Sequence, residues 1–248
     1  MTLLTKRMRT QTVRNASLGL IKVRRDERTG ALMYQQRGGN QSAVDAGGVS
    51  LDTYIHALFG LTMQTGACNV LMIGCAGGTL ATMLQRVGLQ VTAVDIDNAS
   101  FTLARQHFGM PRAVRCHVGD GLAFMQRTRA KFDVVIVDAF IGEKVPPQFT
   151  GDAFCAAAKR CLSKTGAIFV NVCLDGRADR TADAIALTLK RNGWPTRLLD
   201  EPGPQRNAIV LAGRVRALTR PKFLMRPQVR PGYIIRALKA MRYRRPRA

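Results

Sequence analysis

The feature that most constrains the fold is the segment 69–97, which reads NVLMIGCAGGTLATMLQRVGLQVTAVDID. This order predicts a buried strand, a glycine turn, a helix and a second buried strand that ends in an acid. Glycines let a backbone turn tightly and approach a ligand, and the next helix directs its free N–H groups at that place. Asp95, at the end of the second strand, is placed to accept hydrogen bonds from two ribose hydroxyls. The segment is typical of half of a nucleoside-binding crevice.

Strands and helices alternate along most of the chain. The expected strands are nearly continuous apolar runs, as in a parallel sheet that is covered on both faces. We expect strands at Val70–Ile73, Val91–Val94, Val114–His117, Phe132–Val137, Ala167–Val172, Thr196–Leu199 and Asn207–Leu211. We expect helices at Leu51–Met63, Gly78–Val87, Ala99–Phe108, Gly121–Arg129, Thr150–Leu162 and Arg180–Asn192. The sequence therefore predicts an α/β protein with a doubly wound, mostly parallel Rossmann-like sheet.

A smaller unit is expected ahead of this sheet. Turn residues at 28–30 and 37–40 separate three short runs, Leu18–Arg25, Ala31–Gln36 and Gln41–Asp45, which predict a small antiparallel sheet. We therefore divide the chain into a small N-terminal β-sheet region (1–50), a Rossmann-like nucleoside-binding domain (51–213) and a basic C-terminal tail (214–248).

The charge of the chain is strongly basic and unevenly distributed. The formal net charge is +22, and residues 202–248 contain 13 Lys and Arg but no Asp or Glu. Such a segment attracts polyanions such as nucleic acid or an anionic membrane surface. A solvated arm without a dedicated partner is the alternative. Apolar residues at helical spacing within Tyr233–Tyr243 predict a short amphipathic basic helix there.

Several protein classes are disfavoured. The chain has no run of 18 uncharged apolar residues, so we expect no transmembrane segment. The stretch Met1–Arg14 is basic and lacks an apolar core of the secretory type, so we expect a cytoplasmic location. The six cysteines form no Cys-x-x-Cys pair and the chain has three histidines, so we expect reduced thiols and no metal site.

Several segments together resemble a known family. They are Gly38-Gly39-Asn40-Gln41-Ser42, Tyr54-Ile55-His56, Ile73-Gly74-Cys75-Ala76-Gly77-Gly78-Thr79, Val94-Asp95-Ile96-Asp97, Val118-Gly119-Asp120-Gly121 and Phe132-Asp133-Val134-Val135-Ile136-Val137-Asp138. In this ordered set, which runs from about Leu18 to Leu211, the chain resembles the spermidine synthase (polyamine aminopropyltransferase) family. That family lies within the class I S-adenosylmethionine-dependent methyltransferase fold, whose last strand is antiparallel.

The resemblance implies a role for each matched residue. Asp95 would hold the ribose and Asp120 the adenine amino group, while Asp138 would stand beside the reacting amine. Gln41, Tyr54 and His56 would line the aminopropyl and amine end. The catalytic candidates are Asp138, Tyr54 and His56. The donor-binding candidates are Gln41, Gly74, Gly77, Gly78, Asp95, Asp120 and Gly121.

Each of these residues also has a purely structural interpretation. The three aspartates could cap helices or make turns. His56 could be a packed helix residue, and Gln41 could only close a strand pairing.

The chain departs from the family pattern at three places. The family's glycine loop usually carries an Asp that faces the donor's amine, and here Cys75-Ala76 supply no acid. The family's last motif has a second acid, the catalytic base, three residues after the first, and here Asp138 is followed by Ala139-Phe140-Ile141. The Tyr-His pair is usually followed by Glu, where this chain has Ala57. Glu143 is a candidate for the missing second acid.

The resemblance implies aminopropyl transfer from decarboxylated S-adenosylmethionine to a small amine such as putrescine, by a homodimer. A methyltransferase using S-adenosylmethionine is the first alternative, because the carboxylate of that donor suits a helix N-terminus without an acid. A catalytically idle family member that binds nucleic acid through its basic tail is the second.

Overall fold

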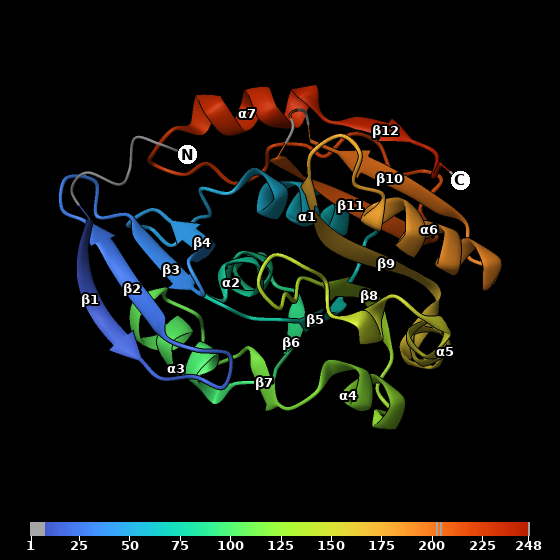
Figure 1. Cartoon of the computed structure of the whole chain (residues 1–248), viewed down its shortest axis with the longest axis horizontal. Helices are drawn as coiled ribbons and strands as arrows, with labels where there is room; N and C mark the ends of the chain where they lie inside the picture. Colours follow the sequence, from blue (N-terminus) through green and yellow to red (C-terminus); the bar gives the residue numbers. More distant parts are fainter. Residues whose placement is uncertain (1–7, 202, 204, 248) are drawn as a thin grey trace.

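The N-terminal part forms a small antiparallel sheet, as predicted. The computed structural model describes residues 8–201, 203 and 205–247 (Figure 1). The strands, in the order β1-β2-β3-β4, are β1 (Met8–Arg14), β2 (Ile21–Asp26), β3 (Leu32–Gln36) and β4 (Gly39–Val44). The strand β1 is not predicted from the sequence, because most of its side chains are exposed and show no apolar alternation. Residues 1–7 of the basic N-terminus lie outside the described residues.

The main sheet confirms the predicted α/β class. Its strands are β5 (Asn69–Ile73), β6 (Gln90–Asp95), β7 (Arg115–Val118), β8 (Phe132–Val137), β9 (Leu162–Asp175), β10 (Thr196–Asp200), β11 (Gln205–Gly213) and β12 (Arg242–Arg244). The spatial order is β12-β10-β11-β9-β8-β5-β6-β7. The strands from β5 to β9 are parallel, and β11 is antiparallel to β9. Chain order reverses between β5 and β8, where ligands of such sheets bind.

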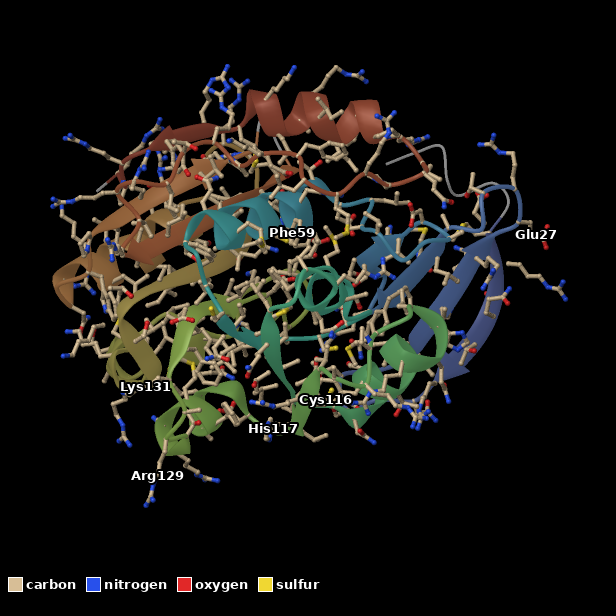
Figure 2. All side chains as sticks on the ribbon, turned by 180° about the vertical axis from the view of Figure 1, so that it is seen from behind. Glu27, Phe59, Cys116, His117, Arg129 and Lys131 are labelled. Atoms are coloured by element: carbon tan, nitrogen blue, oxygen red, sulfur yellow. The ribbon has the colours of Figure 1, made fainter. Side chains whose placement is uncertain are left out.

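Helices cover both faces of this sheet. They are α1 (Thr53–Gln64), α2 (Thr79–Arg86), α3 (Asn98–His107), α4 (Gly121–Arg127), α5 (Asp152–Cys161), α6 (Thr181–Arg191) and α7 (Pro231–Ala240). Side chains of a strand alternate between its faces, so Val134 and Ile136 join the core under α1 and α2, while Val135 and Val137 join the core under α5 and α6. Figure 2 shows Phe59 of α1 inside the molecule, whereas Arg129 and Lys131 point outward.

The described part of the C-terminal tail is not a solvated arm. Its amphipathic helix is present as α7, whose Ile234 and Leu238 are buried. β12 then pairs with β10 and becomes the last strand of the main sheet. The alternative of a solvated arm does not describe these residues, because the apolar side of α7 packs against α1 instead of facing water. The three-part division of the chain stays a prediction.

Two further boundaries differ from expectation. β9 runs from Leu162 to Asp175, much longer than the expected Ala167–Val172, because β11 pairs with it up to Asp175. The preceding helix α5 ends at Cys161. Among the described residues no helix has the length and apolar character that crossing a membrane requires.

Candidate functional site

The glycine turn brings two strand ends into contact. Gly74 follows β5 with φ +93°, and a Cβ placed there would lie 2.2 Å from the carbonyl oxygen of Asp138. A side chain is therefore excluded by both the backbone conformation and the space. Gly121 begins α4, and a Cβ there would lie 2.4 Å from Cγ2 of Ile73. These two glycines allow β5, β8 and α4 to meet at one edge of the sheet.

A cavity of about 990 Å³ opens at this edge. It is lined by the strand ends of β5, β6, β8 and β9, the start of α1, and β4 of the small sheet. Seven of the predicted site residues line it, namely Gln41, Tyr54, Gly74, Asp95, Asp120, Gly121 and Asp138. The structure thus brings together residues that lie up to 97 positions apart in the chain. Their individual roles stay predictions.

Three predicted site residues do not line the cavity. His56 is 1% exposed, its Nε2–H donates to the Ser50 carbonyl oxygen at 2.8 Å, and its ring lies 5.4 Å from that of Phe223. Burial lowers the pKa of His56. His56 is thus a packed residue of the α1 helix, which is the structural alternative given for it above. Gly77 donates its N–H to Oγ of Ser42 at 3.1 Å, and Gly78 caps the start of α2. Gly77 and Gly78 therefore belong to the glycine turn but lie outside the cavity lining.

Asp95, the last residue of β6, is held by two backbone hydrogen bonds. Its Oδ2 accepts the N–H of Cys75 at 2.8 Å, and its Oδ1 accepts the N–H of Asp97 at 2.9 Å. Burial raises the pKa of Asp95 in spite of these hydrogen bonds. Each carboxylate oxygen has a further lone pair, so Asp95 retains the capacity to accept two hydroxyl groups. This arrangement fits a ribose.

Asp120 both caps a helix and lines the cavity. Its Oδ1 accepts the N–H of Ala123 at 2.7 Å and so caps α4, which is the structural alternative. Its Oδ2 accepts Nε2 of Gln148 at 3.2 Å, and Asp120 and Gln148 both line the cavity. The pair presents polar atoms at the place where the resemblance implies an adenine.

Asp138 is the first member of a hydrogen-bonded chain at the other end of the cavity. Its Oδ1 accepts Nδ2 of Asn171 at 2.8 Å, and Oδ1 of Asn171 accepts Nδ2 of Asn207 at 2.9 Å. The backbone N–H of Asn207 donates to Oε2 of Glu201 at 3.1 Å. Burial raises the pKa of Asp138 to about 6 and also raises that of Glu201. The chain links two carboxyl groups that follow β8 and β10, through Asn171 of β9 and Asn207 of β11, the two strands that lie between them.

Asp52 adds a third carboxyl group, which sequence reasoning missed. It precedes α1, lines the cavity, and accepts the N–H of Ala43 on its Oδ2 at 2.9 Å. Burial raises its pKa to about 7, with smaller contributions from the charges of Glu201 and Asp138. No ion pair among the described residues involves Asp52 or Asp138. This acidic end of the cavity, formed by Asp52, Asp138 and Glu201, is suited to a cation because each added positive charge would stabilise the ionised carboxyls.

Tyr54 completes the acidic end. Burial raises the pKa of its phenol well above the usual value, and the charges of Asp138 and Asp52 act in the same direction. The phenol therefore keeps its proton and can donate a hydrogen bond. Among the described residues, no group of three or more His, Cys, Asp or Glu side chains is arranged to hold a metal ion.

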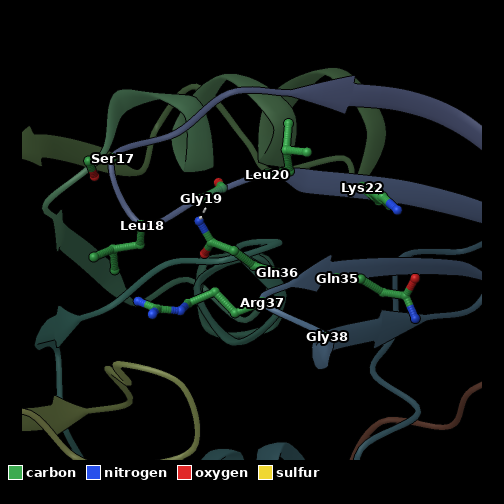
Figure 3. A pocket seen from close by; sticks show the side chains of 9 residues that line it. All are labelled: Ser17, Leu18, Gly19, Leu20, Lys22, Gln35, Gln36, Arg37 and Gly38. Atoms are coloured by element: carbon green, nitrogen blue, oxygen red, sulfur yellow. Dashed lines mark hydrogen bonds between the residues drawn. The ribbon is translucent and has the colours of Figure 1, made fainter.

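A second hollow of about 650 Å³ lies on the small sheet (Figure 3). Leu18, Gln36 and Gly38 line both hollows, and Nε2 of Gln36 donates to the Gly19 carbonyl oxygen at 3.2 Å. The charged residues in its lining are Lys22 and Arg37. Because it contains no carboxyl group, it is not suited to an amine.

The comparisons with known proteins agree with the fold. A family model described as a methyltransferase domain matches residues 70–166. The crystal structure of a probable spermidine synthase from Corynebacterium glutamicum ATCC 13032 superposes with a TM-score of 0.76 at 18% identity, covering 95% of this chain and 90% of that one. The small antiparallel sheet ahead of the Rossmann-like sheet is part of this likeness, because nearly the whole chain is covered. The chain has the class I methyltransferase fold, and its structure is similar to that of this probable spermidine synthase.

Sequence relatives come from two groups of transferases. A probable polyamine aminopropyl transferase from Bifidobacterium longum is 28% identical over 121 residues, which cover 48% of this chain and 27% of that protein. An eEF1A lysine and N-terminal methyltransferase homolog from Drosophila pseudoobscura pseudoobscura is 30% identical over 154 residues, which cover 53% of this chain and 23% of that protein. The matched region thus spans about a quarter of each of these relatives.

Proposed function

We propose that this spermidine synthase-like chain transfers an aminopropyl group from decarboxylated S-adenosylmethionine to a small cationic amine such as putrescine. The observation that carries the proposal is the acidic end of the cavity, where Asp52, Asp138 and Glu201 line the space and the charges of Glu201 and Asp138 act on Asp52. A nucleoside held by Asp95 would place its sulfonium group between the two ends. A diamine with two positive charges matches an end that has several carboxyl groups.

In this proposal Asp138 and Tyr54 act on the acceptor amine. The reaction is a displacement at the carbon next to the sulfonium: the amine nitrogen forms the new C–N bond, the C–S bond breaks, and methylthioadenosine leaves. Only a neutral amine has the required lone pair, so a carboxylate must take its proton. Asp138 is the proton acceptor in this proposal, since Asn171 fixes one of its oxygens and leaves the other free. Tyr54 orients the amine, and positioning supplies much of the remaining acceleration.

Asp52 and Glu201 take the place of the second acid that the sequence motif lacks. Both line the cavity, although Asp52 directly precedes α1 and Glu201 directly follows β10. They would bind the distal ammonium of a diamine. Glu143, the candidate from the sequence, also lines the cavity but is exposed, so water would screen its charge more strongly.

The pH dependence of amine turnover tests the role of Asp52. In the wild type, kcat/KM for the amine is expected to rise between about pH 5.5 and pH 8, since Asp138 and Asp52, with pKa values of about 6 and about 7, become charged in this range. Asp52→Asn should lower kcat/KM about tenfold or more at pH 8 and move the acidic limb toward the pKa of Asp138. Steady-state rates at saturating donor measure both effects.

Glu143→Gln is the matched comparison for Asp52→Asn. Because Glu143 is exposed, its replacement should change kcat/KM less than about threefold. An unchanged pH limb in Asp52→Asn, or an equal loss in Glu143→Gln, would remove Asp52 from the amine site.

The donor preference tests the reaction itself. Calorimetry with decarboxylated S-adenosylmethionine, S-adenosylmethionine and methylthioadenosine should show at least about tenfold tighter binding of the decarboxylated donor than of the intact one. Asp95→Asn should weaken all three by a similar factor, since the nucleoside is common to them. Mass spectrometry of a reaction with putrescine should then detect spermidine. Tighter binding of the intact donor, or no product, would contradict aminopropyl transfer.

One observation favours methyl transfer as the second candidate. The glycine turn presents Cys75 and Ala76 to the cavity and no acid, so the ammonium of the decarboxylated donor has no carboxylate there. The carboxylate of intact S-adenosylmethionine would not be repelled at this place. The calorimetric preference separates the two reactions.

Two expectations stay predictions. A homodimer is checked by light scattering of the purified chain. A cytoplasmic location is checked by fractionation of cells that produce the full-length protein.

A further inference from the structure

Apart from Arg206 and Arg230, which line the cavity, the Lys and Arg of the C-terminal segment lie outside the site of the proposed reaction. Of its 13 Lys and Arg, all except Arg206 and Arg244 are exposed, and the segment after residue 201 contains no acid. At long range this charge would even repel a polyamine. A ligand for these Lys and Arg side chains would therefore have to be an anion and not a polyamine.

The end of the C-terminal segment, which carries these exposed charges, is held against the main sheet by several contacts. Nε of Arg244 donates to Oδ2 of Asp200 at 2.8 Å, and its Nη2 donates to Oδ2 of Asp183 at 3.0 Å. The guanidinium carbon of Arg197 lies 3.7 Å from the centre of the Tyr243 ring. Together with the pairing of β12 and β10, these contacts fix the end of the segment to the main sheet. A fixed support lowers the entropic cost of binding to a partner.

α7 presents its two sides differently. Ile234 and Leu238 are 1% and 2% exposed and face the core, whereas Arg236 and Lys239 are exposed. These two cations are three residues apart and so lie on one side of the helix. Figure 2 shows nitrogen-tipped side chains projecting outward along α7 and the strand that follows it. We call the exposed Lys and Arg of residues 214–247, with the exception of Arg230 in the cavity lining, the basic face.

We propose that the basic face binds the phosphate backbone of nucleic acid without sequence preference. A fixed array of cations fits a regular row of phosphates. Insertion into a membrane surface requires a helix with an exposed apolar side, and in α7 that side is already buried against the protein. This proposal does not depend on the proposed reaction, because a chain without transferase activity would bind equally well.

The test measures binding of the full chain to labelled nucleic acid. Fluorescence anisotropy with a short single-stranded RNA and a duplex DNA, at about 50 and about 200 mM salt, should show an affinity loss on the order of 10³-fold or more between the two salt concentrations. The double variant Arg236→Gln with Lys239→Gln should weaken binding about 10- to 100-fold at the lower salt and reduce the salt slope by about two. The RNA and DNA arms identify which nucleic acid is preferred.

A matched double variant separates the basic face from net charge. Arg127 and Arg129 are exposed at the end of α4 and beyond it, and Arg129 lies on the opposite side of the molecule from α7 in Figure 2. Replacing both by Gln removes the same charge and should change affinity less than about threefold. An equal loss in both double variants overturns the proposal. So does binding to phosphatidylserine vesicles with no measurable binding to either nucleic acid.

Discussion

Asp138→Asn is expected to lower kcat/KM for the acceptor amine by about 10²- to 10⁴-fold, the range for loss of a general base. Asparagine keeps the shape of the side chain but cannot take a proton from the attacking nitrogen. Asp138 lies at the end of β8, with one oxygen bonded to Asn171 at 2.8 Å, so the isosteric amide should preserve the local packing. Calorimetric affinity for the donor should stay within about threefold, because Asp95 lies on a different strand.

Asp138→Asn needs a control variant that loses the same charge away from the cavity. Asp152→Asn removes the same charge from an exposed position at the start of α5, outside the cavity, and its kcat/KM should be close to that of the wild type. If Asp138→Asn retained more than about a third of wild-type kcat/KM, another group would have to remove the proton. If donor affinity fell as steeply as turnover, Asp138 would be a structural residue.

The second large effect is expected from Gly74→Ala, which should lower the free energy of unfolding by about 3–5 kcal/mol. A Cβ at Gly74 would lie 2.2 Å from the Asp138 carbonyl oxygen and 3.1 Å from Cα of Ala139, and both are backbone atoms that cannot rotate away. The strands β5 and β8 would have to separate. Donor binding should be lost together with stability, since the cavity is built on that contact.

Gly88→Ala isolates the backbone contribution to this effect. Gly88 has φ +88°, close to the +93° of Gly74, but no atom lies within 4 Å of a Cβ placed there. Its replacement should cost only about 1 kcal/mol, the strain of a positive φ. Urea unfolding measures both variants. Equal losses in the two would mean that conformation alone, and not the approach of Asp138, requires glycine at position 74.

Local patterns predicted the parallel strands and the residues at their ends. Apolar runs bounded by glycines define β5 and β6, and Asp95 follows from its place at the end of the second run. Such predictions succeed because strand ends of a parallel sheet gather at one edge whatever the details of packing. The same reasoning predicts Asp120 and Asp138 at this edge, and both line the cavity, while their roles stay predictions.

His56 shows where a sequence motif misleads. Tyr54 and His56 are two positions apart on α1, and successive residues of a helix are rotated by about 100°, so the two side chains point in nearly opposite directions. Tyr54 faces the cavity and His56 therefore faces the core. The helix itself was predicted, and applying its periodicity to the pair would have removed His56 from the candidates.

Asp52 and Glu201 could not be paired from the sequence. They are 149 positions apart, and the antiparallel insertion of β11 between β9 and β10 brings the second of them to the cavity. That strand order is a long-range property of the sheet and leaves no local signal. Likewise, β12 is three residues long, too short for any periodicity to show.

The short strand β12 has a consequence for how the chain can be handled. It covers the outer edge of β10, whose other edge pairs with β11. A version cut after the main domain would leave the N–H and C=O groups on that outer edge without partners and would uncover Leu199 and the neighbouring apolar residues. Open strand edges of this kind join other chains into aggregates. Shortened versions are therefore expected to precipitate before any loss of ligand affinity could be assigned to the missing positive charges.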